Sequence, residues 1–207
     1  MDSKENLQVM RCWLVAEWGK PQGNMSSVEI EKFTLEVENK VLKIPSPELI
    51  EKVRTMLVQD PVKFFRLTAW RWDHREIFMK EFGPWCTVGD ALPLEACKHS
   101  VVETFEFIRN NPQELPQDLR DRGNSNDKYI KCVDKLQSIA RMADFIRSRE
   151  LLSIIVAESE QRGREKGCDK RRYSSEDGSH RAVALALAGH ETVSAWVGNP
   201  LEGMVKE

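Results

Sequence analysis

The chain has 207 residues, of which 41% are hydrophobic and 31% charged, and a formal net charge of −2. This length and composition predict one good hydrophobic core, with at most a small appendage. The slightly acidic balance argues against a protein whose whole surface binds phosphate. A nucleic-acid contact would have to come from a local basic patch.

The start of the chain carries no apolar run long enough to cross a membrane. Its first apolar run, residues 9–18, is interrupted by Arg11 and Glu17 and is too short for a span. The five cysteines are scattered and odd in number, which is typical of a reducing compartment. We therefore expect no membrane span and a cytoplasmic location, a nuclear location or both.

Residues 9–44 favour strands. Residues 9–18 are rich in β-branched and aromatic side chains, and a turn-rich stretch, residues 19–24, follows. In residues 27–37 apolar and polar side chains alternate, with a slip near Lys32 that a β-bulge would explain. With a short third strand at residues 41–44, this region predicts a small antiparallel sheet.

Helical patterns dominate from Pro45 onward. Ser46-Pro47 and Asp60-Pro61 each combine a capping residue with proline at the first helical position. They predict one helix to about Val58 and a second to Phe82, stopped by Gly83-Pro84. Further helices are expected after Asp90 to Asn110, and from Asn126 through residue 155 with a break near Ser148.

Residues 162–177 differ from the rest of the chain in composition, with many cations, two serines and an acidic pair. Such a segment cannot build a core, so we expect residues 161–181 to be an exposed, flexible linker between a globular domain, residues 1–160, and a C-terminal region, residues 182–207. Phosphorylation of Ser174 or Ser175 would neutralise the basic patch. Its expected partner-binding or nucleic-acid-binding cations are Arg162, Arg164, Lys166, Lys170, Arg171 and Arg172.

The C-terminal region contains an alanine-rich apolar stretch, residues 182–188, followed by Gly189. Seven consecutive small apolar residues leave no polar face, so the predicted helix must pack on the body, on a second copy or on a partner. We interpret it as an interaction helix, with Leu185 at its contact surface.

Aromatic and arginine side chains are concentrated in the helix predicted for residues 61–82. They could form a stacking platform for nucleic-acid bases, with Arg71 and Arg75 contacting phosphates. The alternative is that most of these rings form the core. Trp70 and Trp72 would lie about 200° apart on a helix, so one of them is expected to be exposed and to contact a partner.

No signature of catalysis or metal binding is found. Cys86, Cys97, His99 and Cys132 are suitable zinc ligands, but they lack the paired spacing of structural zinc sites. The chain has no G-x-S-x-G, P-loop, G-x-G-x-x-G or H-E-x-x-H motif. We therefore assign no catalytic residue, no metal and no cofactor.

These features predict an α+β fold: a small N-terminal antiparallel sheet, a predominantly helical body, a flexible basic linker and a C-terminal apolar helix. The favoured function is that of a non-enzymatic regulatory protein that binds another macromolecule, most simply a protein. Virus-encoded accessory proteins and host regulatory factors both fit this description. The alternatives are an RNA- or DNA-binding protein and a small enzyme with an unrecognised acid–base site.

Overall fold

A computed structural model describes residues 3–20, 25–83, 100–158 and 172–200. The described residues are mostly helical, with one mixed, curled sheet. The helices are α1 (Lys4–Trp18), α2 (Ser27–Leu42), α3 (Ser46–Met56), α4 (Pro61–Ala69), α6 (Val101–Asn110), α7 (Gln117–Asp121), α8 (Asn126–Ala140), α9 (Ala143–Arg147) and α11 (Ser179–Leu187). The strands and short 3-10 helices are β1 (Arg71–Phe78), η1 (Met79–Glu81), β2 (Phe82–Gly83), η2 (Glu150–Leu152), β3 (Ile154–Glu158), β4 (Tyr173–Asp177) and β5 (Thr192–Asn199).

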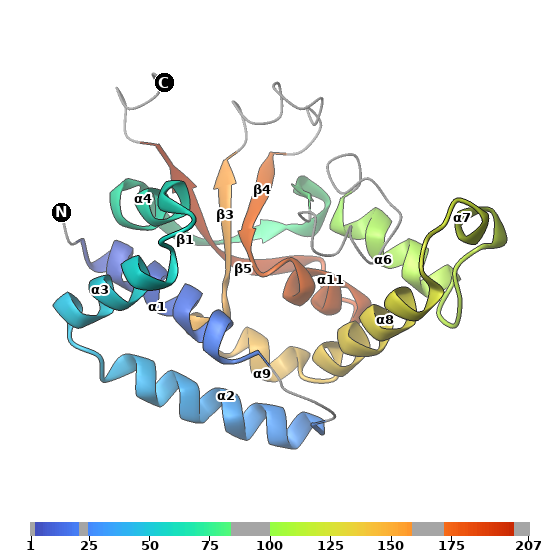
Figure 1. Ribbon diagram of the computed structural model, residues 1–207, viewed down its shortest axis with the longest axis horizontal. Helices are drawn as coiled ribbons and strands as arrows, with labels where there is room; N and C mark the ends of the chain where they lie inside the picture. Colours follow the sequence, from blue (N-terminus) through green and yellow to red (C-terminus); the bar gives the residue numbers. More distant parts are fainter. Residues whose placement is uncertain (1–2, 21–24, 84–99, 159–171, 201–207) are drawn as a thin grey trace.

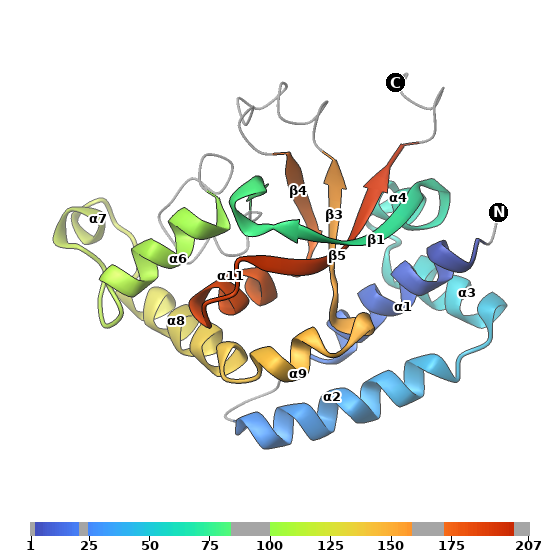
Figure 2. The ribbon, with the colours of Figure 1, turned by 180° about the vertical axis from the view of Figure 1, so that it is seen from behind.

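The sheet has five strands in the order β1-β5-β3-β4-β2. Strand β5 runs antiparallel to β1 and parallel to β3, with Phe78 opposite Thr192 and Ile154 opposite Ala195. Strand β4 runs antiparallel to β3 and parallel to β2. Helices α1, α3 and α4 lie at one side of the sheet and α6, α7 and α8 at the other, with α11 and α2 below it (Figure 1). The reverse view shows the same arrangement (Figure 2).

The predicted N-terminal sheet is wrong, because residues 4–42 form two helices. Ser26 and Glu29 make a reciprocal capping box at the start of α2. The buried residues Ile30, Thr34, Val37 and Val41 then follow at helical spacing, four, three and four residues apart. What resembled a slip in a strand alternation is therefore the 3.6-residue period of a helix.

The two helix starts predicted at proline are confirmed, but the second helix is shorter than expected. Helix α3 begins at Ser46 itself, with Pro45 at the N-cap and no capping side chain, so Ser46 is not the cap that the sequence predicted. In α4 the Asp60 carboxylate accepts a hydrogen bond from the Lys63 amide at 2.9 Å, as a capping residue does. Helix α4 ends at Ala69, and residues 71–78 pair along their whole length with β5. Tertiary strand pairing thus overrides the helical pattern that the sequence suggested there.

The C-terminal apolar helix exists, but it belongs to the core rather than to a separate region. Residues 182–186 of α11 are at most 4% exposed, and α11 packs against α8 and α6. Gly189, with φ of 90°, follows the helix and β5 begins three residues later. Residues 173–177 of the predicted linker form β4, while residues 161–171 lie outside the described part of the chain.

The end of the predicted helix at residues 126–155 also differs. Helix α8 ends at Ala140, the short helix α9 follows, and residues 154–158 form the central strand β3. Four of the five β3 residues are buried, so this strand is covered on both faces. A continuous apolar run of this length fits a buried strand as well as a buried helix. This is why residues 154–155 were predicted as the end of a helix although they begin β3.

Candidate functional site

The junction between β4 and α11 is built around a glycine. Gly178 follows the last residue of β4 with φ of 91° and ψ of 16°, and α11 begins at Ser179. A Cβ atom at this position would lie 2.6 Å from the Cγ2 atom of Ile154, so both the backbone angle and the space require glycine. In the described part of the chain no side chain caps this helix start. The start of a helix carries amide hydrogens and a partial positive charge that attract anions.

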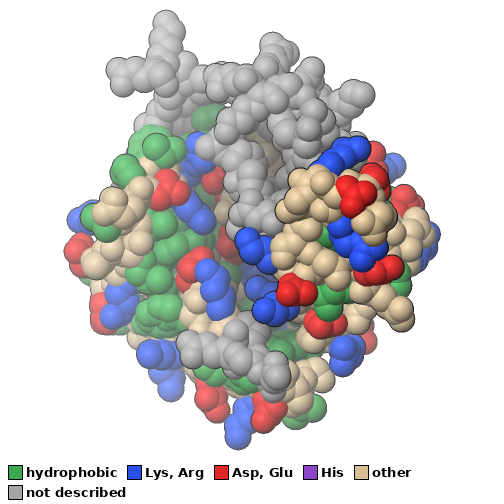
Figure 3. Space-filling model, turned by 45° about the vertical axis from the view of Figure 1, so that its right-hand side comes forward, with side chains coloured by type: hydrophobic (Ala, Val, Ile, Leu, Met, Phe, Trp, Pro, Cys, Tyr) green, Lys and Arg blue, Asp and Glu red, His purple; other side chains and the backbone are tan. Residues whose placement is uncertain are grey.

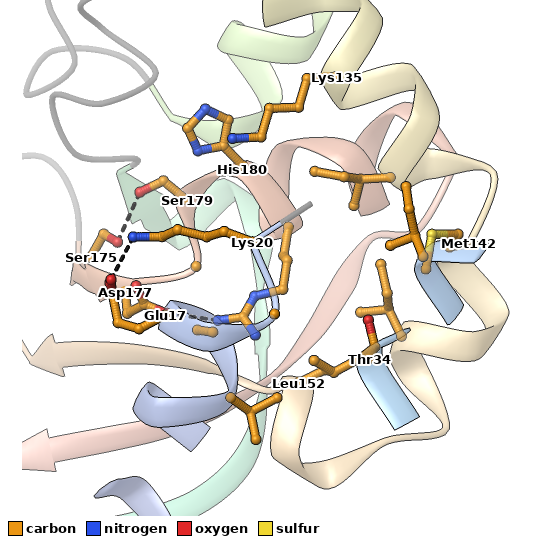
Figure 4. A pocket seen from close by; sticks show the side chains of 18 of the residues that line it. Glu17, Lys20, Thr34, Lys135, Met142, Leu152, Ser175, Asp177, Ser179 and His180 are labelled. Atoms are coloured by element: carbon orange, nitrogen blue, oxygen red, sulfur yellow. Dashed lines mark hydrogen bonds and ion pairs between the residues drawn. The ribbon is translucent and has the colours of Figure 1, made fainter. Parts of the chain in front are cut away.

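A cavity of about 530 Å³ lies against this helix start. Its walls come from the end of α1, the start of α2, the middle of α8, the α9 region and the β4–α11 junction (Figure 4). One end is polar and is lined by Lys20, Lys135, Ser175, Asp177, Ser179, His180 and Arg181. The other end is largely apolar and is lined by Ile30, Thr34, Ile139, Met142, Ile146 and Leu152.

The acidic groups at the polar end are held in ion pairs. The Asp177 carboxylate accepts a hydrogen bond from the Arg181 guanidinium at 2.7 Å, and the Glu17 carboxylate accepts one from the Lys20 amine at 2.6 Å. Among the described residues, the Arg181 Nη1 atom is buried without a hydrogen-bond partner. Lys135 adds a further positive charge from α8. Glu176 also lines the cavity and pairs with Arg66 at 3.0 Å, so all three carboxylates of the lining are paired with cations.

His180 lies beside these cations. Burial, then the positive charge of Lys135, then that of Lys20, lower the pKa of the imidazole from 6.5 to about 4. Figure 4 shows the His180 ring next to the Lys135 side chain. The imidazole is therefore neutral at pH 7, and its nitrogens are available as one donor and one acceptor.

The cavity combines an anion-attracting end with an apolar end, which suits a small organic anion. Figure 3 shows Lys and Arg side chains near the middle of one face, with Asp and Glu side chains among them and an apolar area beside them. Pockets of this size, with apolar walls and a few convergent polar groups, are typical of small-molecule sites. The described residues contain no group of three His, Cys, Asp or Glu side chains placed to bind a metal ion. Cys86, Cys97 and His99 lie outside them.

The aromatic and arginine residues predicted as a binding surface do not form one platform. Trp72 is 3% exposed and packs over Gly198, whereas Trp70 is half-buried with its ring centre 6.1 Å from that of Trp72. Arg71 is exposed on β1. The two tryptophans lie at a helix–strand junction rather than on one helix, so the helical spacing argument does not apply, and a partner contact at Trp70 stays a prediction.

Arg75 and Arg172 are brought together by the sheet. Both guanidinium groups contact the carboxylate of Glu158, at 3.8 Å for Arg75 and 3.0 Å for Arg172. The other predicted cations lie outside the described residues: Arg162, Arg164, Lys166, Lys170 and Arg171. The described residues thus give the nucleic-acid prediction no added support, and it stays a prediction.

The predicted modification and interaction residues lie in or near the sheet. Ser174 and Ser175 belong to β4; Ser175 is 7% exposed and accepts a hydrogen bond from the Ser179 hydroxyl at 2.8 Å. The Ser174 hydroxyl oxygen is buried. Leu185 is 2% exposed inside the core, so in this fold it presents no contact surface.

Sequence reasoning missed the residues that line the polar end of the cavity. A local signal existed in Asp177-Gly178-Ser179, where a glycine stands between a polar segment and an apolar helix. Because the residues before it are densely charged, this stretch was instead predicted to be part of the flexible linker, residues 161–181. Lys20 and Lys135 carry no local signal, because only the tertiary structure brings them to the cavity.

Comparisons with known proteins add no assignment: no family model matches the chain, and neither curated proteins nor solved structures give a significant match. Among the described helices, none is both long and apolar enough to cross a membrane. The function must therefore be inferred from the site.

Proposed function

We propose that this protein binds a small organic anion in the cavity at the β4–α11 junction. The anionic group would lie at the start of α11, near Lys20, Lys135 and Arg181, and an apolar group would extend toward α2 and α8. One observation supports this proposal most: the polar and apolar ends belong to one cavity. The cavity joins the start of α11, which follows Gly178 and has cations around it, to an apolar wall.

Charge supports the position of the anion. The helix start and the nearby cations attract negative charge, and hydrogen bonds to charged partners are about twice as strong as neutral ones. The three carboxylates that would repel an anion, Glu17, Glu176 and Asp177, are each paired with a cation. An anion there would also offer an acceptor to the buried Nη1 atom of Arg181.

Size supports the second part of the ligand. A volume of about 530 Å³ lies within the roughly 300–1,000 Å³ range of small-molecule pockets. An inorganic anion alone would leave the apolar end, with Ile139, Met142 and Leu152, in contact with water. An apolar group on the same molecule would remove that surface from water, which is favourable. We therefore expect an amphiphilic ligand rather than a free ion.

Regulation by this ligand is compatible with the regulatory role predicted from sequence. Binding a macromolecular partner stays a prediction: most of its proposed residues are buried, paired or outside the described chain, whereas Arg71 is exposed. The cavity proposal needs none of those residues, so the cavity proposal and the partner prediction can be tested separately.

The direct test is a calorimetric titration of the full chain with phenyl phosphate, which carries both an anionic and an apolar group. Lys135→Ala should weaken binding roughly tenfold or more, because a hydrogen bond to a charged group contributes about 1.5–3 kcal/mol. Lys131→Ala is the matched control, since Lys131 is an exposed lysine on the same helix that does not line the cavity. Equal affinity of the two variants, or no saturable binding to the native chain, would contradict the proposal.

A further inference from the structure

We infer that the anionic group of the ligand is a dianion, as in a phosphate monoester, and that its binding adds a proton to His180. This inference rests on the proposed function, and it assigns His180 the role of distinguishing dianions from monoanions. A singly charged carboxylate or sulfonate of the same shape would bind less tightly.

The position of His180 carries the inference. It is the second residue of α11, and its side chain lines the same cavity as the helix start. In Figure 4 the imidazole lies next to the side chain of Lys135, and Lys20 extends into the same polar end. An anion bound at the helix start would therefore lie among Lys20, Lys135 and His180.

The charged groups around His180 come from several elements. Lys20 and Glu17, at the end of α1, pair with each other at 2.6 Å. On its own segment, Asp177 pairs with Arg181 at 2.7 Å and Glu176 pairs with Arg66 of α4 at 3.0 Å. Helix α8 supplies Lys135, and α4 supplies Lys63, whose amine lies 5.5 Å from the Trp13 ring centre. Helix α6 packs against α11 and carries Glu103 in its first turn, in a capping box with Ser100.

In the cavity without an anion, these surroundings disfavour a charged imidazole. Protonation would add a positive charge beside Lys135 and Lys20 in a partly buried place, and the pKa of His180 is accordingly lowered to about 4. A dianion would place two negative charges among the same groups. These negative charges would offset the positive charge of Lys135 and Lys20 that disfavours the imidazolium, and would therefore favour uptake of a proton by His180.

The proton balance is simple. One proton moves from solvent to the free imidazole nitrogen, and the resulting imidazolium donates a hydrogen bond to an oxygen of the ligand. No covalent bond forms or breaks. A monoanion offsets less of the lysine charge, so it raises the pKa of His180 less. Because phosphate monoesters lose their second proton at a pKa of about 6, they are largely dianionic at pH 7.

The test compares phenyl phosphate with benzenesulfonate, which has a similar ring and a single charge. The His180 ring signal is followed by NMR from pH 4 to pH 8 in the native full chain, with each compound at saturation. Phenyl phosphate should raise the titration midpoint of His180 from about 4 to above pH 7, a roughly thousandfold gain in proton affinity, so that the imidazole is protonated at pH 6.5. Benzenesulfonate should raise it less.

Affinity provides a second measurement. At pH 6.5 the native chain should bind phenyl phosphate more tightly than benzenesulfonate by about tenfold or more, and His180→Gln should remove most of that preference. If phenyl phosphate binds while the His180 midpoint stays unchanged, or if benzenesulfonate binds equally well, the inference is wrong and the proposed function stands. If neither compound binds, both are wrong.

Discussion

Gly178 joins β4 to α11 with a backbone φ of 91°, a region that side-chain-bearing residues rarely adopt. The space around it is also closed, because an added Cβ would meet the Ile154 side chain at 2.6 Å and the Arg181 guanidinium at 3.0 Å. Ile154 belongs to the central strand β3 and cannot move without disturbing the sheet. Any substitution of Gly178 therefore affects the helix start and the core together.

Gly178→Ala should lower the free energy of unfolding by more than about 1 kcal/mol, because the new methyl group is strained by the backbone and collides with Ile154. Chemical denaturation of the full chain measures this change. Gly123→Ala is the matched control: Gly123 has φ of 85° but open space around it, so only the backbone strain applies. A cost at Gly178 no larger than at Gly123 would show that the contact with Ile154 is not tight.

Single residues of the site differ in how far the sequence reveals them. The glycine between a polar segment and an apolar helix is visible in the sequence, and so is the histidine that follows. The role of these two residues depends on β4, which ends just before the glycine. This strand was not expected, because the polar sequence Ser-Ser-Glu-Asp has low strand propensity. Lys20 and Lys135 reach the cavity from α1 and α8, and no local pattern indicates that they meet.

At the scale of elements, capping signals were the reliable part of the sequence. Proline after Ser46 and Asp60 marked the starts of α3 and α4, and Asn126 marked α8 within one residue of its cap. Ser26 and Glu29 form a capping box at the start of α2, but the alternation of apolar and polar residues led to a strand prediction there. A capping box deserved more weight than propensity, because propensity is readily overridden by packing.

Helix α11 shows the limit of composition as a guide. Its apolar residues suggested a surface for a partner, with Leu185 at the contact. Because Leu185 is 2% exposed, Leu185→Ala should instead lower the free energy of unfolding by about 2–5 kcal/mol. Val58→Ala, at a site that is 69% exposed, should change it by less than about 0.5 kcal/mol. Thermal or chemical unfolding that gives similar small costs at both sites would contradict the core position.

For the whole molecule, the sheet determines both the fold and the site. Its strands come from residues 71–83 and from residues 154–199. Helices α6, α7 and α8 therefore lie, along the chain, between two segments that pair in the same sheet. Pairing of β1 with β5, and of β2 with β4, joins residues about a hundred positions apart, and local sequence patterns do not encode such partners. The helical content was therefore partly predictable, whereas the sheet and the cavity beside it were not.

The central claim is that a small organic anion binds at the start of α11. Amide NMR of the full chain, titrated with phenyl phosphate, tests it most directly because each backbone amide reports its own surroundings. We predict saturable shifts that are largest at Gly178, Ser179 and His180 and extend to Lys20 at the other wall of the cavity. Shifts that are largest near Arg71 and Arg75, or the absence of any saturable shift, would contradict the account.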